Sequence, residues 1–252
     1  MSLRKFLNKT IGPIFWSSYG PDLFFKLYTK IEDSKVFLDY CLKLHGTTSC
    51  TFNMLSPTQR DFFFQNITNK EKLIVLELGH GPGGLACEVG QLNNCEKLIG
   101  IDYSGFIPKK HPRNVHFFKN DLGKINFESK QFDLIYCVDS FYHIQKKERL
   151  IKRILNALNE NGEFILFCSF TNEEERIDFF ELIKKFNVQT FDFTEDDRDY
   201  WSKNDNLLKA MEIDFKANYL SDVYAMREKE IEKFKSAHKN QEASRFCFIF
   251  KN

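Results

Sequence analysis

From residue 73 onward, apolar runs of strand length alternate with segments of helical periodicity. Turn residues or charges bound five of these runs, and we expect strands at residues 73–78, 97–101, 115–119, 132–138 and 163–170. Between the last two runs, apolar residues recur at the spacing of one helix face: Leu150, Ile151, Ile154, Leu155 and Leu158. Strands that alternate with helices form βαβ units, so the pattern predicts an α/β protein with a parallel sheet.

The rest of this region predicts two more strands and the helix boundaries. Residues 188–193 and 245–251 are apolar runs that we expect to form the last strands. Asn161-Gly162 is expected to end the helix before the fifth strand. Thr171 stands three residues before Glu174, which fits a capping box at the start of the next helix.

Two segments outside this alternation are predicted to be helical. In residues 1–72, helix signals are a start at Gly20-Pro21, an end at His45-Gly46 and a capping box at residues 56–59. Residues 194–244 carry one apolar face at i, i+4 spacing: Leu207, Met211, Phe215, Tyr219 and Val223. We therefore expect a helical cap (1–72) and a core (73–252) whose insertion (194–244) acts with the cap as a lid.

Composition excludes several other classes of protein. The 252 residues include 36 basic and 35 acidic ones, without a long block of either sign, so nothing predicts nucleic-acid binding. Seven cysteines form no close pairs, which favours reduced thiols in a cytoplasmic protein. No apolar stretch predicts a membrane span or signal peptide. We expect a small-molecule partner, with no signal for an oligomeric state.

Residues 73–84 carry the strongest chemical signal, a buried strand that breaks into a glycine-rich turn. Glycine lets the backbone approach a ligand closely, as in nucleotide cradles. The spacing Gly79-x-Gly81-x-x-Gly84 also satisfies the dinucleotide fingerprint. Glu77 separates the two possibilities, because a carboxylate there repels a pyrophosphate and attracts a cation. The sulfonium and ammonium of S-adenosylmethionine fit such an acid.

Residues 77–83, Glu-Leu-Gly-His-Gly-Pro-Gly, resemble the first motif of the class I S-adenosylmethionine-dependent methyltransferases: acidic, x, Gly, x, Gly, x, Gly. The resemblance covers residues 73–193 and 245–252. It implies a Rossmann-like, seven-stranded, mostly parallel sheet with an antiparallel last strand. A helical cap and an insertion before the last strand are similar to those of small-molecule methyltransferases. The implied cofactor is S-adenosylmethionine.

The resemblance assigns the donor-binding residues. Glu77, Gly79 and Gly81 would hold the methionine part, with His80 contributing its backbone. Asp102 ends the second strand 19 residues after Gly83, where an acid can bind both ribose hydroxyls; the alternative is a solvated strand end.

Three further positions complete the predicted donor site. Tyr103 would lie along the adenine face, although a rim tyrosine is nearly as plausible. Asp121 matches the family position that bonds the adenine amino group, with the Leu122 amide facing the ring; its alternative is a turn-forming aspartate. Val138, at the end of the fourth strand, would border the donor.

Residues 137–143, Cys-Val-Asp-Ser-Phe-Tyr-His, correspond to the stretch that borders the methyl donor and receives the acceptor in class I enzymes. His143 is the candidate general base, because its ordinary pKa of about 6.5 lets it accept a proton. Tyr142 and Asp139 are alternatives, and Phe141 would contact the acceptor. A histidine that only anchors the loop is equally compatible, because positioning alone can carry methyl transfer. No Asp-Asn pair follows the fifth strand, so no metal is expected.

Aromatic residues of the cap and insertion could line an apolar acceptor cavity. Tyr19 and Trp201, nearest the predicted hinges, are our candidates for acceptor contacts. For most of the others, including Tyr28, packing of helices onto the sheet is the simpler interpretation.

These observations predict methyl transfer to an oxygen or nitrogen of a small, partly apolar acceptor. One alternative is a non-catalytic protein that keeps the fold for binding or scaffolding. Another is an NAD(P)-dependent oxidoreductase, since Tyr142-x-x-x-Lys146 fits the short-chain dehydrogenase pair. That tyrosine follows the fourth strand instead of the fifth, and Glu77 would oppose the cofactor phosphates.

The segment between the second and third strands departs from the family. Relatives place a full helix here, but residues 103–112 include Pro108 and Pro112. Proline limits any helix to about a turn. The adenine side of the site is therefore expected to be open.

Overall fold

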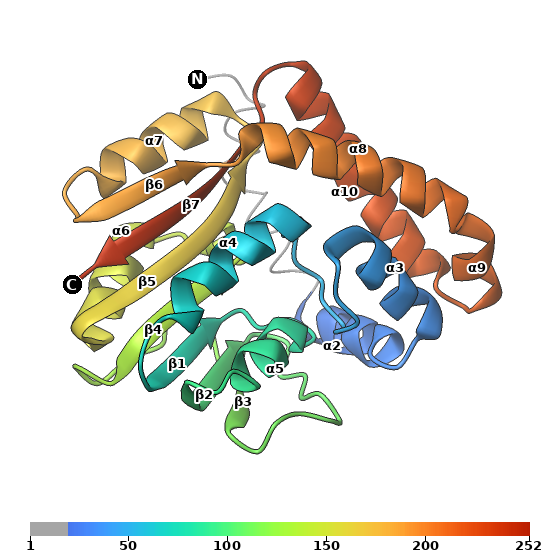
Figure 1. The fold of residues 1–252 in the computed structure, drawn as a ribbon. Coiled ribbons are helices and arrows are strands. Elements are labelled where there is room, and N and C mark those ends of the chain that lie inside the picture. The colour runs from blue at the N-terminus through green and yellow to red at the C-terminus, as the bar shows by residue number, and fades with distance from the viewer. Residues whose placement is uncertain (1–19) are drawn as a thin grey trace.

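The computed structural model describes residues 20–252, apart from the side chain of His143. Within them, seven strands form one sheet in the order β3-β2-β1-β4-β5-β7-β6 (Figure 1). The strands are β1 Leu73–Leu78, β2 Cys95–Asp102, β3 Val115–Lys119, β4 Phe132–Val138, β5 Leu158–Phe170, β6 Val188–Asp192 and β7 Ser244–Lys251. Only β7 runs antiparallel to its neighbours. The predicted Rossmann-like sheet is confirmed.

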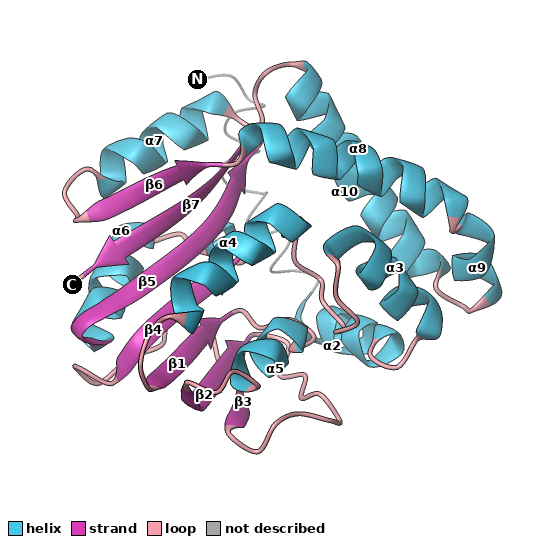
Figure 2. Ribbon diagram, in the orientation of Figure 1, coloured by secondary structure: helices cyan, strands magenta, loops and turns pink. Residues whose placement is uncertain are grey.

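Helices cover both faces of the sheet (Figure 2). Before and between the strands lie α2 Gly20–Ile31, α3 Lys35–His45, α4 Pro57–Thr68, α5 Gly84–Gly90, the short 3₁₀ helix η1 Phe141–His143, α6 Lys147–Ala157 and α7 Glu173–Ile183. The insertion before β7 holds α8 Thr194–Ala210, α9 Glu212–Ala217 and α10 Ser221–Lys239.

The central strand β1 is buried on both faces, as its continuous apolar run predicts. Leu76 and Leu78 pack in the cluster that includes residues of α6 and α7. Leu73 and Val75 pack in the cluster that includes residues of α4 and α5. Alternation along the strand therefore places Glu77 on the α4 and α5 side.

A third apolar cluster contains residues of α2 and α3 together with residues of the insertion, so the cap helices and the insertion share one core. Trp201 of α8 is fully buried and stacks on Phe234 of α10, with ring centroids 4.3 Å apart and planes 6° apart. Its indole N–H donates to Asp197, which also contacts His238 Nε2 at 2.8 Å. These contacts favour packing for Trp201, and its acceptor role stays a prediction.

The boundary of the cap at residue 72 also stays a prediction. Helix α4 lies inside the predicted cap, yet its Phe63 and Ile67 pack with strand residues such as Val75. Its start follows the predicted capping box, since Ser56 Oγ accepts from Gln59 N–H at 3.1 Å. Of the predicted cap, α4 therefore packs on the sheet, whereas α2 and α3 pack against the insertion.

Three local predictions are wrong in detail. Asn161 has φ of 64° inside β5, and the β4–β5 register shifts there, so Asn161-Gly162 forms a bulge. Asn172, not Thr171, caps α7 by accepting from Glu175 N–H. Of the apolar face predicted for the insertion, Leu207, Met211, Phe215 and Val223 pack in one cluster, but Tyr219 lies in the turn between α9 and α10 with φ of 60° and is 86% exposed.

The segment between β2 and β3 contains no helix, as its prolines predict. Its Phe106 packs edge-on against Tyr28 of α2, with ring centroids 5.8 Å apart. Lys109 pairs with Asp33, next to the start of α3. The loop is thus packed against the cap. Across residues 20–252, we find no helix with the length and apolar character that crossing a membrane requires.

We expect Trp201→Ala to lower the free energy of unfolding by about 3–5 kcal/mol, because it removes a fully buried stacked ring and leaves a cavity. Urea denaturation followed by circular dichroism measures the loss. Ile213→Ala, a change at an 81% exposed position of the same insertion, should alter stability by no more than about 0.5 kcal/mol. A loss near 1 kcal/mol or less for Trp201→Ala would contradict the packing role.

Candidate active site

The candidate site lies where the sheet's topology reverses. From β1 the chain proceeds to β2 on one side, and from β4 it proceeds to β5 on the other. In open α/β sheets ligands bind at the carboxyl ends of the strands flanking such a switch point. The turns after β1 and β4 meet here. A Cβ on Gly79, whose φ is 81°, would be 2.2 Å from Ser140 Oγ, so only glycine allows this approach.

The rest of the glycine turn is tied to its surroundings by backbone contacts. Gly79 N–H donates to the carbonyl of Ile101 in β2 at 2.7 Å. A Cβ on Gly84 would be 2.1 Å from the carbonyl oxygen of Cys50, so the loop before α4 lies directly against the turn. The turn is therefore covered from the side of the cap.

Glu77 is the buried acid of the site, with 3% of its surface exposed. Its Oε2 atom is buried, and the carboxylate forms no ion pair with the described residues. Burial raises the pKa of Glu77 to about 8, a hydrogen bond with the Tyr136 hydroxyl on the neighbouring strand opposes the rise, and the nearby Asp102 carboxylate adds to it. A ligand cation here would satisfy the oxygen and restore the charged form, so the residue fits the ammonium of S-adenosylmethionine.

Asp102 holds the glycine turn to the end of β2. Its Oδ2 accepts from Gly81 N–H at 3.0 Å, and its Oδ1 accepts from the backbone and hydroxyl of Ser104 at 2.8 and 2.5 Å. These contacts fix the carboxylate beside the turn. Its ribose role stays a prediction that this position supports. Tyr103, the next residue, is 47% exposed at the rim.

The predicted adenine contacts follow β3. Asp121 Oδ1 accepts from Gly123 N–H at 2.9 Å, the contact of a turn-forming aspartate. The Leu122 side chain is buried in the sheet core, which fixes the backbone of this loop. Both ligand roles stay predictions. Val138 ends β4 with 5% of its surface exposed, next to the switch point.

His80 is buried between the first two glycines of the turn, with 4% of its surface exposed. Its ring packs against Phe117 of β3, with centroids 4.6 Å apart. Burial lowers the pKa of His80, which keeps the ring neutral. Its place inside the turn agrees with a backbone contribution, which stays a prediction.

Asp139 is engaged in a buried ion pair instead of facing an open pocket. Both of its oxygens bind the Arg245 guanidinium at the start of β7, and Oδ2 also accepts from Met54 N–H at 2.8 Å. The Arg245 Nε–H donates to Gln59 of α4 at 3.0 Å. The pair thus joins β4, β7 and the segment around the start of α4. The acceptor and catalytic roles of Asp139 stay predictions, and these contacts favour positioning.

The other acceptor candidates are placed as follows. Phe141 is 1% exposed and packs against Phe179 of α7 at 6.2 Å, inside the sheet core. Tyr142 is 47% exposed beside it. Tyr19 and the side chain of His143 lie outside the described residues. Among the described acceptor candidates, Tyr142 is thus the one with an exposed side chain, and its charge acts on the pKa of Tyr28, which lies over the glycine turn.

Tyr28 of α2 packs in the cap cluster, as the sequence predicts, and its hydroxyl also lies at the candidate site. A Cβ on Gly81 would be 3.6 Å from the Tyr28 hydroxyl, so this side chain lies over the glycine turn. Burial raises the pKa of Tyr28 well above 10, and the charges of Asp102 and Tyr142 add to the rise. Nothing in the pattern of an aromatic-rich helix distinguishes the ring that faces a site from those that face neighbouring helices.

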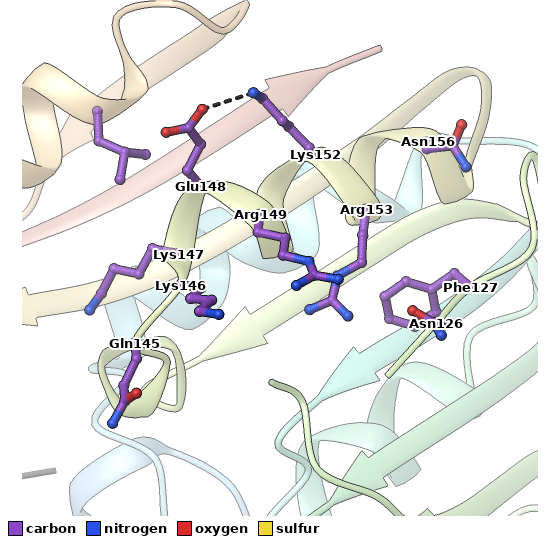
Figure 3. Close-up of a pocket in the computed structure, with 11 residues that line it drawn as sticks. Asn126, Phe127, Gln145, Lys146, Lys147, Glu148, Arg149, Lys152, Arg153 and Asn156 are labelled. Atoms are coloured by element: carbon purple, nitrogen blue, oxygen red, sulfur yellow. Dashed lines mark ion pairs between the residues drawn. The ribbon is translucent and has the colours of Figure 1, made fainter. Parts of the chain in front are cut away.

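A separate basic hollow of about 780 Å³ lies on α6 (Figure 3). The side chains that line it include Lys146, Arg149 and Arg153, and Glu148 pairs with Lys152 at 2.8 Å. None of the predicted donor or acceptor residues lines it. Among residues 20–252, no three histidine, cysteine or acidic side chains group as a metal site.

Comparison with known proteins matches residues 57–187, just over half of the chain, to the family described as "Methyltransferase domain". The sterol 24-C-methyltransferase of Saccharomyces cerevisiae is 30% identical over 103 residues, or 37% of this chain and 27% of that protein. The mitochondrial ubiquinone biosynthesis O-methyltransferase of the same yeast is 28% identical over 120 residues, or 43% and 37%. The matched part is thus well under half of either relative.

The phosphoethanolamine N-methyltransferase 2 of Haemonchus contortus, solved in complex with S-adenosyl-L-methionine, shares the fold with a TM-score of 0.72. The alignment covers all of this chain and 60% of that one, at 14% identity. The family match spans the glycine turn, Asp102 and the switch point, and the sheet has the seven strands and the strand directions that this family implies. The chain therefore belongs to the class I S-adenosylmethionine-dependent methyltransferases.

Proposed function

We propose that this protein binds S-adenosylmethionine at the carboxyl ends of β1 and β4 and transfers its methyl group to an oxygen or nitrogen of a small, partly apolar acceptor. The observation that carries the proposal is the buried carboxylate of Glu77, which forms no ion pair with the described residues and lies directly before the glycine turn. A buried carboxylate without a counter-ion is unfavourable as an anion. The donor's ammonium would provide the missing positive charge.

The residues around Glu77 would hold the donor by distinct contacts. Gly79 and Gly81 let the backbone approach it, with φ of 81° and 56°. The Asp102 carboxylate accepts a hydrogen bond from the Gly81 amide. At this position it could also accept hydrogen bonds from the ribose hydroxyls. Asp121 and the Leu122 amide would receive the adenine.

When bound, S-adenosylmethionine supplies an electrophilic methyl carbon on a positively charged sulfur. The protein's task is to align the acceptor's lone pair with that carbon and to exclude water. Tyr28 and the loop at Cys50 cover the glycine turn and would perform that exclusion. His143, after β4, is the proposed group for accepting a proton from the acceptor. Burial raises the pKa of Tyr142, so its neutral hydroxyl would orient the acceptor by a hydrogen bond.

The names of the relatives support a small acceptor, because the yeast and nematode proteins are named for sterol, ubiquinone and phosphoethanolamine chemistry. The cap here carries packed aromatic rings, which would contact such a molecule beside the glycine turn. Tyr28 packs against Phe52 with ring centroids 6.0 Å apart, and Phe52 stacks on Phe37. An aromatic interior favours an acceptor with apolar surface.

We expect Asp102→Ala to weaken binding of S-adenosylhomocysteine at least about tenfold. Hydrogen bonds to a charged group contribute about 1.5–3 kcal/mol, and 1.4 kcal/mol corresponds to a factor of ten. Isothermal titration calorimetry measures the affinity. The control is Asp192→Ala, a change at another aspartate that ends a strand. Asp192 accepts a hydrogen bond from Thr194 N–H, and its replacement should leave the affinity unchanged. Equal affinity in wild type and Asp102→Ala would argue against this donor site.

Donor binding should release a proton, because the pKa of Glu77 is about 8 without ligand and the donor's cation stabilises the carboxylate. Between pH 6 and pH 7.5 the affinity is expected to rise with pH by up to about tenfold per unit. Calorimetry at pH 7 in buffers of different ionisation enthalpy counts the released proton.

The matched variant for this measurement is Glu77→Gln, which keeps the shape and cannot ionise. Its donor affinity should be weaker and independent of pH over the same range. Binding to the wild-type protein without proton release would show that Glu77 does not meet the donor's ammonium.

A further inference from the structure

Arg227 of α10 is a fully buried cation in the cap, away from the glycine turn. Its guanidinium lies over the ring of Phe52, 3.8 Å from the ring centroid. Nη1 donates to Glu230 Oε2 at 2.6 Å. The other donors, Nε and Nη2, are buried and have no hydrogen-bond partner. One edge of a rigidly held guanidinium is therefore unused.

The unused edge has a definite chemical preference. Nε–H and Nη2–H point in parallel and match two oxygens of a carboxylate or phosphate. Leaving charged donors buried without partners is costly, so such an edge calls for a ligand or a water molecule. Phe52 and Glu230 fix the plane of the guanidinium, which leaves this edge preorganised for one class of group.

Two more buried polar groups near Arg227 lack partners. On α8, the Tyr200 hydroxyl and the Asn204 amide nitrogen are both unsatisfied. The Asn204 Oδ1 atom accepts from Tyr40 at 2.5 Å, so its nitrogen is the free end of a fixed amide. The charge of Arg227 acts on the pKa of both Tyr40 and Tyr200, which places these side chains in its neighbourhood. The free groups on α8 and α10 can all donate.

This cluster of donors adjoins the proposed methyl-transfer site. The Phe52 ring that supports Arg227 packs 6.0 Å from the ring of Tyr28, whose hydroxyl lies over Gly81. The ring of Phe52 therefore lies between Arg227 and Tyr28. Glu230 is 27% exposed, so solvent reaches the edge of the cluster.

We propose that the Nε and Nη2 edge of Arg227 binds an oxyanion of the methyl acceptor, a carboxylate or a phosphate group, with Tyr200 and Asn204 as further donors. The inference rests on the proposed function and narrows its acceptor to small molecules that carry an anionic group away from the methylated atom. Glu230 offsets part of the Arg227 charge, so a singly charged carboxylate is balanced better than a phosphate dianion.

The test uses the full-length protein saturated with S-adenosylhomocysteine and two simple probes, acetate and inorganic phosphate, against chloride at equal ionic strength. A ligand that binds the folded state raises the melting temperature with concentration, which yields an affinity. We expect acetate to stabilise the wild-type protein, and the phosphate arm shows whether a phosphoryl group is accepted as well. Stabilisation by neither anion would overturn the proposal.

Three variants locate the binding. Arg227→Met should weaken anion binding at least tenfold. Arg227→Lys should recover only part of that affinity, because lysine keeps the charge without the two-donor edge. Glu230→Gln should strengthen anion binding, since it removes a neighbouring negative charge and leaves Arg227 in place. If Arg227→Met fails to fold, the opposite effects of the other two variants decide the question.

Calorimetry with S-adenosylhomocysteine separates this proposal from the proposed function. Its affinity should stay unchanged in all three variants, because none of them touches the glycine turn. Anion binding that persists in Arg227→Met, or that weakens in Glu230→Gln, would contradict the Arg227 site. Anion binding that follows the expected pattern in a protein that ignores S-adenosylhomocysteine would leave the anion site standing while the donor proposal fails.

Discussion

Glu77 stands between β2 and β4 at the carboxyl end of β1, in register with Gly100 and Tyr136. It is buried, and it forms no ion pair with the described residues. Because a charge in a low-dielectric interior needs a counter-charge, this position either holds a proton or waits for a cation. The glycine turn that follows opens the backbone to a ligand at the same place. The chemistry proposed for the protein depends on this one carboxylate.

Buried polar contacts join the segment around the start of α4 to the ends of β4 and β7 and to α8, in addition to the apolar packing of the cap. Asp139 and Arg245 bind each other and the segment around α4, and Asp139 adopts a left-handed φ of 56° to do so. Ser56 and Gln59 both donate to Asp196 at the start of α8, at 2.6 and 2.7 Å. The first turns of α4 and α8 are thereby joined. Because hydrogen bonds are directional, these contacts fix the orientation of the cap and the insertion relative to the glycine turn.

The sheet was largely predictable because its strands are dense apolar runs between charges. The predicted bounds of β1, β3 and β4 agree with the structure. The start of β5 was not predictable, since residues 158–162 are mostly polar and include the left-handed Asn161. The glycine turn and its acid were recognisable from spacing alone.

The remaining parts of the site depend on contacts that no local pattern records. Arg227 lies in a run of charges, Arg-Glu-Lys-Glu, which reads as a solvated helix face, yet the side chain is fully buried. Asp139 and Arg245 are 106 residues apart. The sequence around Tyr28 does not distinguish it from the other aromatic residues of the same helix. Only the packing of the cap on the sheet decides which of these side chains face inward.

The central claim is that a buried acid before the glycine turn selects a cationic donor and rejects a diphosphate. The most direct measurement is calorimetric titration of the wild-type protein with S-adenosylmethionine and, separately, with NADH and NADPH. The account predicts saturable binding of S-adenosylmethionine and no heat from either dinucleotide. Binding of a dinucleotide in preference to S-adenosylmethionine would contradict it.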